Sequence, residues 1–363
     1  MPKSAVDVIG SAFDHTQVQL TRPFRFGQWA RLAVLALATG EMSSGGGCNS
    51  FKGLGNLPSK FPGNPQNFAD PGDLLTNLGL DPAVLLSMVM VLVVGFLVLG
   101  LVWLYVSSIS RFVLFESVLR KNCELHAGWN RWHAQGLRYF GWQLALSFVG
   151  LGVAGVLFIP LLLPVFAAMR SHGQPGPALF LAFLPMVFIF GIFGAVVLLI
   201  AVLTKDFVIP LMALDGVGVI EGWRRLLAMM KTEKGGYALY IVMKIVLAIG
   251  AAVVFGVLSS VVILVLLLPI GIVGGLVFLL GKGAHLGWDA FTITAVVVAG
   301  VIVLSLLMYV IALVCVPVAV FFPAYAMYFF AERYPALHAL LYPPPPAAPP
   351  PLPPLSPMPA PIG

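Results

Sequence analysis

Residues 83–106 read AVLLSMVMVLVVGFLVLGLVWLYV, a run of 24 residues without a charged side chain. A helix needs about 20 apolar residues to cross the roughly 30 Å hydrocarbon core of a bilayer, because each residue adds about 1.5 Å. Four further segments have comparable length and composition, at 143–169, 178–203, 237–268 and 291–316. The repeated pattern predicts an all-α fold, a polytopic bundle of transmembrane helices.

The composition of the whole chain agrees with this prediction. Hydrophobic residues make up 60% of the 363 residues, charged residues only 9%, and the mean hydropathy is +1.00. A soluble domain carries about 25% charged residues, which cover its surface. Here the surface is expected to face lipid.

A sixth candidate span, Trp29 to Met42, contains only 14 residues and would reach roughly 21 Å. It could cross if the bilayer thins or if Arg25 and Arg31 snorkel to the headgroups. It could instead be a half-buried interfacial helix. The charge distribution favours the crossing, which gives about six spans arranged as three helical hairpins.

The Gly-rich stretch at 270–280 leaves a second alternative open, because it is apolar but short and follows Pro269. It could end a second crossing that begins near Val261. It could also be a re-entrant or interfacial piece, which is tolerated at membrane depth where protein shields the backbone.

Lysine and arginine predict the orientation, because cytoplasmic loops of membrane proteins carry an excess of both. Only four of the 20 basic residues fall on one side of the six-span arrangement: Lys52, Lys60, Arg170 and Lys282. The opposite side holds 1–28, the loops 107–142 and 204–236, and the C-terminal segment. Both termini are therefore expected in the cytoplasm.

This arrangement predicts three parts. Residues 1–28 form a cytoplasmic N-terminal segment, and 29–335 form the transmembrane domain, with an extracytoplasmic loop at 43–81. Residues 336–363 form a Pro-rich tail without charge after Pro343. Such a tail favours extended polyproline II structure, cannot build a core, and is expected to be disordered.

An internal repeat is visible at separations of 94 to 98 residues. The segment 111–115 corresponds to 206–210, and 127–131 (AGWNR) corresponds to 221–225 (EGWRR). Tyr139 corresponds to Tyr237, and a more degenerate third copy begins at Pro317. Each predicted unit is a pair of membrane helices followed by a cytoplasmic segment.

The cytoplasmic segments are expected to form amphipathic helices in the headgroup plane. Within 204–236, apolar side chains recur at helical spacing on one face: Val219, Trp223, Leu226 and Met230. Arg224, Arg225 and Lys231 lie on the other face, which suits anionic lipid headgroups as partners. The net charge of +6 follows from this sorting, so no nucleic-acid partner is predicted.

The sequence contains few motifs that would indicate catalysis or the binding of a cofactor or metal. It contains no P-loop, dinucleotide fingerprint, nucleophile elbow, zinc-protease motif or Cys-x-x-Cys pair, so we predict no catalytic, cofactor or metal site. His126, His133 and Glu124 are the only faint candidates for an interfacial lipid enzyme. Because charged residues also avoid the middle of the spans, we expect a non-enzymatic scaffold or accessory subunit.

A transporter or permease component is the alternative. The repeat and the prolines inside the spans favour it, because broken helices build many transporter sites. A polar pocket formed by Gln143, Ser147, Thr204 and Tyr309 would support this interpretation.

Two blocks carry a family resemblance, 21–29 (TRPFRFGQW) and 206–213 (DFVIPLMA) followed by 220–223 (IEGW). They resemble a set of uncharacterised bacterial multi-pass membrane proteins, a domain of unknown function that is similar to the membrane region of some glycerophosphoryl diester phosphodiesterases. The resemblance implies a helical bundle in the inner membrane. Because no soluble phosphodiesterase domain is recognised in the sequence, it implies neither that activity nor any catalytic residue.

Overall fold

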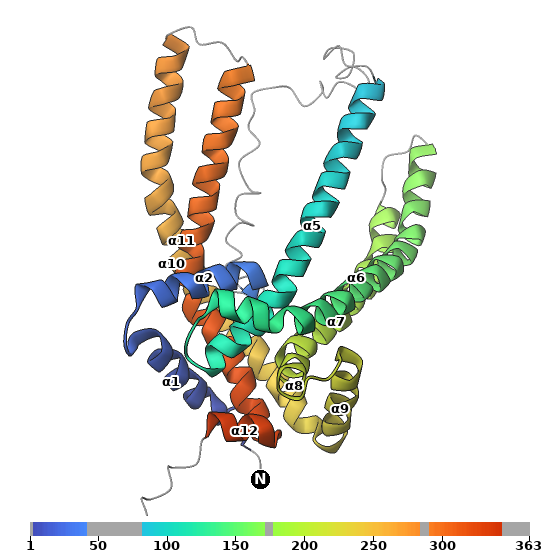
Figure 1. Cartoon of the computed structure of the whole chain (residues 1–363). Helices are drawn as coiled ribbons and strands as arrows, with labels where there is room; N and C mark the ends of the chain where they lie inside the picture. The colour runs from blue at the N-terminus through green and yellow to red at the C-terminus, as the bar shows by residue number, and fades with distance from the viewer. Residues whose placement is uncertain (1–2, 42–81, 171–176, 284–289, 343–363) are drawn as a thin grey trace, which may run out of the picture.

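The computed structural model describes residues 3–41, 82–170, 177–283 and 290–342, and all regular structure in these ranges is helical (Figure 1). The helices are α1 (Val8–Thr21), α2 (Phe26–Thr39), α5 (Pro82–Leu119), α6 (Leu125–Arg170), α7 (Pro177–Leu203), the π-helix η3 (Thr204–Val208), α8 (Ile209–Asp215), α9 (Val219–Thr232), α10 (Lys234–Gly283), α11 (Ala290–Ala331) and α12 (Pro335–Leu341).

Five of these helices are long and apolar enough to cross a membrane: α5, α6, α7, α10 and α11. They contain the five long spans that the sequence predicts. The candidate sixth span corresponds to α2, which has 14 residues and lies across the long helices rather than alongside them (Figure 1). The count of six and the three hairpins therefore stay predictions, and the predicted loop 43–81 lies outside the described residues.

The molecule divides into two zones, which we call the base and the arms. The base comprises 3–41, 105–142, 203–247 and 309–342, and it contains almost all of the buried side chains. The arms are the remaining parts of the five long helices, at the top of Figure 1. Every side chain from Leu86 to Trp103 on α5 is exposed, as lipid-facing residues would be in a structure without a bilayer.

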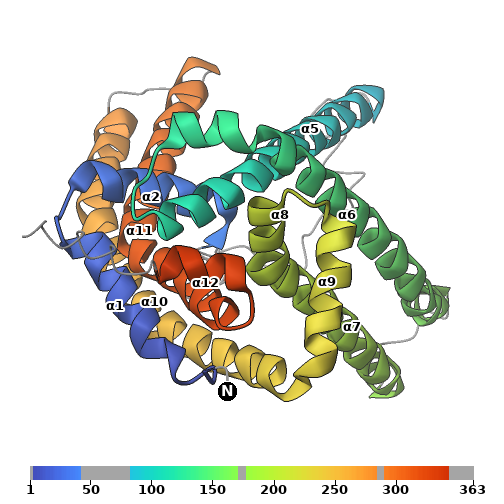
Figure 2. The ribbon, with the colours of Figure 1, turned by 60° about the horizontal axis from the view of Figure 1, so that its bottom comes forward.

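The centre of the base is the C-terminal end of α11. Figure 2 shows it together with α12, with α1, α5, α8 and α10 arranged around them. Phe329 contacts the rings of Phe207, Tyr237 and Tyr240, at centroid distances of 5.9, 5.6 and 4.6 Å. Aromatic packing thus joins η3 and α10 to α11.

The N-terminal segment is folded onto this centre. In α1, His15 makes hydrogen bonds with the Val118 carbonyl oxygen at 2.8 Å and with the Tyr328 hydroxyl at 3.2 Å. Burial lowers the pKa of His15. A neutral imidazole suits both contacts, because one ring nitrogen donates to the carbonyl while the other accepts from the hydroxyl.

Two stretches of the chain continue the long helices and do not form separate elements. The loop 107–142 contains no separate interfacial helix, because α5 continues through it to Leu119 and α6 begins at Leu125 and runs on into the membrane span. No glycine or proline interrupts 101–119, and the base buries Ile109 and Phe112, so nothing ends α5 at the membrane surface. The stretch 270–280, for which two alternatives were open, is likewise helical and continues α10.

The internal repeat is confirmed by two matching glycine contacts. A Cβ atom added to Gly128 would lie 3.0 Å from Cγ1 of Val113, and one added to Gly222 would lie 2.8 Å from Cγ1 of Val208. Each glycine therefore permits the same close approach of two helices, between α5 and α6 in one copy and between η3 and α9 in the other.

Matching aromatic pairs support the same repeat. Tyr139 packs edge-on against Phe112, with ring centroids 6.0 Å apart, and Tyr237 packs edge-on against Phe207 at 5.4 Å. The third copy is more degenerate, as expected, because α11 enters the base in the same way but is followed only by α12, with seven residues. That short helix covers the first residues of the predicted tail, and 343–363 lie outside the described residues.

We expect Gly222→Leu to destabilise the protein by about 1–3 kcal/mol, because the new side chain would overlap Val208 in a packed part of the base. The measurement is the thermal unfolding midpoint of the purified protein in detergent. Gly95→Leu is the matched control, because no atom lies within 4 Å of a Cβ built there. Equal midpoints for the two variants would contradict the repeat contact.

Candidate functional site

Five charged side chains converge inside the base, where α2, α5, η3 and α10 meet beside α11. This ion cluster consists of Glu41, Arg111, Lys205, Asp206 and Lys244. Its two carboxylates are almost completely buried, with side-chain exposures of 4% for Glu41 and 2% for Asp206. Buried charges of this kind are costly unless they are paired, so their pairing identifies the cluster as the candidate site.

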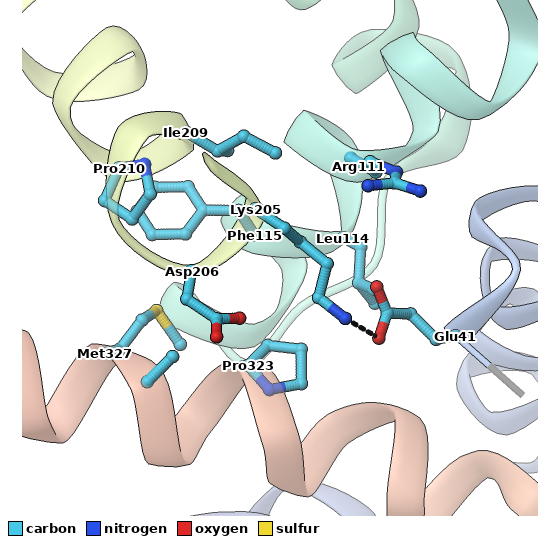
Figure 3. Close-up of a pocket in the computed structure, with 11 residues that line it drawn as sticks. Glu41, Arg111, Leu114, Phe115, Lys205, Asp206, Ile209, Pro210, Pro323 and Met327 are labelled. Atoms are coloured by element: carbon cyan, nitrogen blue, oxygen red, sulfur yellow. Dashed lines mark hydrogen bonds and ion pairs between the residues drawn. The ribbon is translucent and has the colours of Figure 1, made fainter. Parts of the chain in front are cut away.

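Two ion pairs hold the cluster together. Lys205 Nζ lies 2.5 Å from Glu41 Oε2 (Figure 3). Lys244 Nζ forms a second pair with Asp206 Oδ2, which also accepts a hydrogen bond of 3.0 Å from the Tyr240 hydroxyl. The neighbouring residues Lys205 and Asp206 thus connect η3 to two different partners, the chain just after α2 and the start of α10.

Arg111 adds a third cation beside these two carboxylates. It donates to the Tyr139 hydroxyl at 3.1 Å and to the Thr39 carbonyl oxygen at 3.4 Å. Its Nε atom is buried and has no hydrogen-bond partner among the described residues. Burial by itself would raise the pKa of Glu41, but the charges of Lys205 and Arg111 lower it further than burial raises it, so Glu41 stays ionised.

The π-helix has a local cause in the sequence. Pro210 has no N–H, and in a regular α-helix its ring would clash with the carbonyl group four residues earlier, that of Asp206. The chain instead widens by one residue, and the Ile209 N–H bonds to the Thr204 carbonyl oxygen. Such π-bulges are frequent at functional sites. Here the widened turn carries two of the five charged residues.

A small cavity of about 30 Å³ opens inside the cluster. Glu41, Arg111, Lys205 and Asp206 line it together with apolar side chains such as that of Met327 (Figure 3). A cavity must have a volume of about 10–15 Å³ to hold one water molecule. This one has room for about two waters or a small ion, far less than the 300–1,000 Å³ of typical small-molecule sites.

Sequence reasoning missed this cluster. In the sequence, Glu41 lies at the end of the candidate sixth span, Asp206 lies at the start of the predicted cytoplasmic segment 204–236, and Lys244 is close enough to the start of its span to snorkel to the headgroups. The structure instead turns Lys244 inward onto Asp206. One signal in the sequence could have indicated it: a lysine two turns inside an apolar helix requires a buried anion whenever it cannot reach the headgroups.

The candidates for a lipid enzyme are not brought together. His126 and His133 are exposed, and His133 packs against the Tyr105 ring at 6.2 Å. Glu124 instead accepts a hydrogen bond from Asn122. Within the described ranges, no group of three or more His, Cys, Asp or Glu side chains could hold a metal ion.

The four residues of the expected polar pocket also have separate contacts. The Gln143 side chain accepts from Ser108 at 2.6 Å, and Thr204 donates to the Ile200 carbonyl oxygen in the preceding helix, α7. Ser147 is exposed, and Tyr309 packs against the core. The polar pocket is therefore not formed by these residues.

The three basic residues that the sequence analysis assigns to lipid headgroups differ in whether they form an ion pair with a carboxylate. Arg224 pairs with Glu221 at 2.9 Å, and Arg225 pairs with Asp215 at 2.5 Å. Lys231 is exposed near the end of α9. Two of the three cations thus already have carboxylate partners.

Comparison with known proteins gives one match. The sequence profile of a family of unknown function, DUF7544, matches residues 3–340, nearly the whole chain. It provides no link to glycerophosphoryl diester phosphodiesterases. We found no match among curated proteins or among solved structures.

We expect Asp206→Asn to destabilise the protein by about 3–5 kcal/mol, because it leaves Lys244 buried without its counter-ion. Thermal unfolding in detergent provides the measurement. Glu221→Gln is the matched control, since it alters an ion pair at the surface, where such pairs contribute about 0–1 kcal/mol.

The double replacement Asp206→Leu with Lys244→Met should lose less than Asp206→Asn alone, because it removes both charges together. If Asp206→Asn unfolded at the same temperature as Glu221→Gln, the ion cluster would have no structural importance.

Proposed function

The chain belongs to the DUF7544 family of unknown function, and we propose that it is a non-enzymatic scaffold or accessory subunit of the bacterial inner membrane. The observation that carries the proposal is the contrast between the closed base and the open arms. The base is held together by aromatic packing and buried ion pairs, whereas the arms leave apolar surface uncovered along five helices.

Some glycines of the base are in close contact with other helices, whereas others there, such as Gly10 and Gly141, are as open as the glycines described in the arms. In the base, Gly128, Gly136 and Gly222 lie against other helices, so closely that a Cβ would meet a neighbouring side chain. In the arms, Gly95 and Gly250 have no atom within 4 Å of a built Cβ. Small residues allow membrane helices to approach closely. The open glycines therefore support contact between the arms and helices of another protein.

The ion cluster fits this role as a clamp. It fixes the end of α2, the π-helix and the start of α10 to one another through two buried pairs. The arms of α7 and α10 extend from these fixed points, so in this role the clamp sets the positions from which those two helices enter the bilayer. A scaffold needs a fixed spacing of this kind.

A second candidate, a transporter component, is favoured by the ion cluster itself. Ionisable residues within membrane segments often mark ion pathways, and π-bulges are frequent at functional sites. The cavity size would restrict the cargo to a proton or a small ion. Ion flux in proteoliposomes separates the candidates: flux would favour the transporter, and none across a broad set of ions would remove it.

We expect a photo-crosslinking residue at Leu97, which is 62% exposed on the arm of α5, to give a discrete adduct with another membrane protein in native membranes. The same residue at Leu137, which is 49% exposed on the base, is the matched control and should not give this adduct. Adducts of Leu97 with lipid alone, or only with a second copy of the chain, would contradict an accessory role.

The excess of basic residues in the base supports a cytoplasmic location for it. Single cysteines at His126 in the base and at Asn56 in the 43–81 loop, in a background without the native cysteines, should then react from opposite sides of the membrane. An impermeant thiol reagent added to intact cells should label only position 56. Labelling of both positions from outside would refute this topology.

A further inference from the structure

An open groove of about 280 Å³ lies where α9 meets the first turns of α10. Its walls are apolar and its edge is basic, and it is lined by Leu227, Met230, Lys231, Lys234, Tyr237 and Ala238, together with Ile241. The groove is separate from the ion cluster, with which it shares no lining residue.

Both lysines at the edge are exposed and lack a carboxylate within ion-pair distance among the described residues. Glu233, which lies between them in the sequence, is occupied by Arg333, with contacts of 2.6 and 2.8 Å. Arg224 and Arg225 on the same helix have carboxylate partners of their own. Lys231 and Lys234 thus form a local excess of positive charge beside an apolar surface.

The groove continues into the part of α10 that faces lipid. Val242, Ile245 and Ile249 are between 54% and 61% exposed and follow directly after the groove along the helix. The candidate membrane span of α10 begins at Lys234, so the two lysines lie at the basic end of this apolar helix, as lipid phosphates lie at the ends of membrane spans.

We propose that this groove binds one anionic phospholipid from the surrounding bilayer. The phosphate lies between Lys231 and Lys234, because these are the cations without a partner of their own. One acyl chain follows Leu227, Ala238 and Ile241 towards the arm of α10. The inference requires only that α10 enters the bilayer, so it does not depend on the scaffold role.

The charge pattern distinguishes this lipid site from general attraction to an anionic membrane. General attraction would use all basic residues on α9 in proportion to their exposure, and the side chain of Arg224 is 77% exposed. A groove site would instead depend on the two lysines and on the apolar wall together.

The experiment titrates the purified full-length protein in detergent with dioleoyl phosphatidylglycerol and separately with dioleoyl phosphatidylcholine, and counts bound lipids by native mass spectrometry. Lys231→Gln combined with Lys234→Gln should weaken phosphatidylglycerol binding by roughly tenfold or more. Arg224→Gln combined with Arg225→Gln removes the same amount of charge from α9 and should leave the affinity unchanged.

A second variant tests the apolar wall without changing charge. Ala238→Phe fills the groove from an exposed position and should weaken the binding of both lipids. Unchanged unfolding midpoints show that the variants remain folded. Equal losses in the two charge variants, equal affinity of the unaltered protein for both lipids, or no effect of Ala238→Phe would each overturn the proposal.

Discussion

Two apolar helices gain little free energy by packing against each other in lipid hydrocarbon, because the lipid tails are as apolar as leucine. The division of this protein into base and arms follows from that constraint. Side chains from Leu86 to Trp103 on α5 can remain in lipid without loss, and they do not pack against the other helices. Specific packing is concentrated in the base, where aromatic rings, small residues and charges make contact between helices favourable.

The ion cluster is the polar counterpart of this arrangement. A charge that enters the base loses its water, so each carboxylate must be matched by a cation at close range. Asp206 meets this need through Lys244 and the Tyr240 hydroxyl, and Glu41 through Lys205. The same requirement ties the chain just after α2 to η3, and η3 to α10, because each pair joins two of these elements.

The two surfaces that we connect with function use opposite chemistry. The arms offer apolar faces with open glycines, which suit the helices of a partner protein. The groove between α9 and α10 combines an apolar wall with Lys231 and Lys234, which suits a phospholipid. A scaffold that binds lipid at its edge would be anchored in depth and rotation while its arms contact a partner.

The sequence by itself determined the five long helices, because the length and composition of each apolar segment are local properties that lipid reads directly. The sequence also predicted the repeat, since Gly128 and Gly222 occupy equivalent positions in its two matching segments, 127–131 and 221–225. Tertiary structure alone decided that α2 lies across the bundle, because 14 residues suit either a short span or an interfacial helix. Only the tertiary structure shows that Glu41 pairs with Lys205, 164 residues away, and that Asp206 pairs with Lys244, 38 residues away. These pairs depend on which side chains lie close together after folding, and no local sequence pattern predicts that.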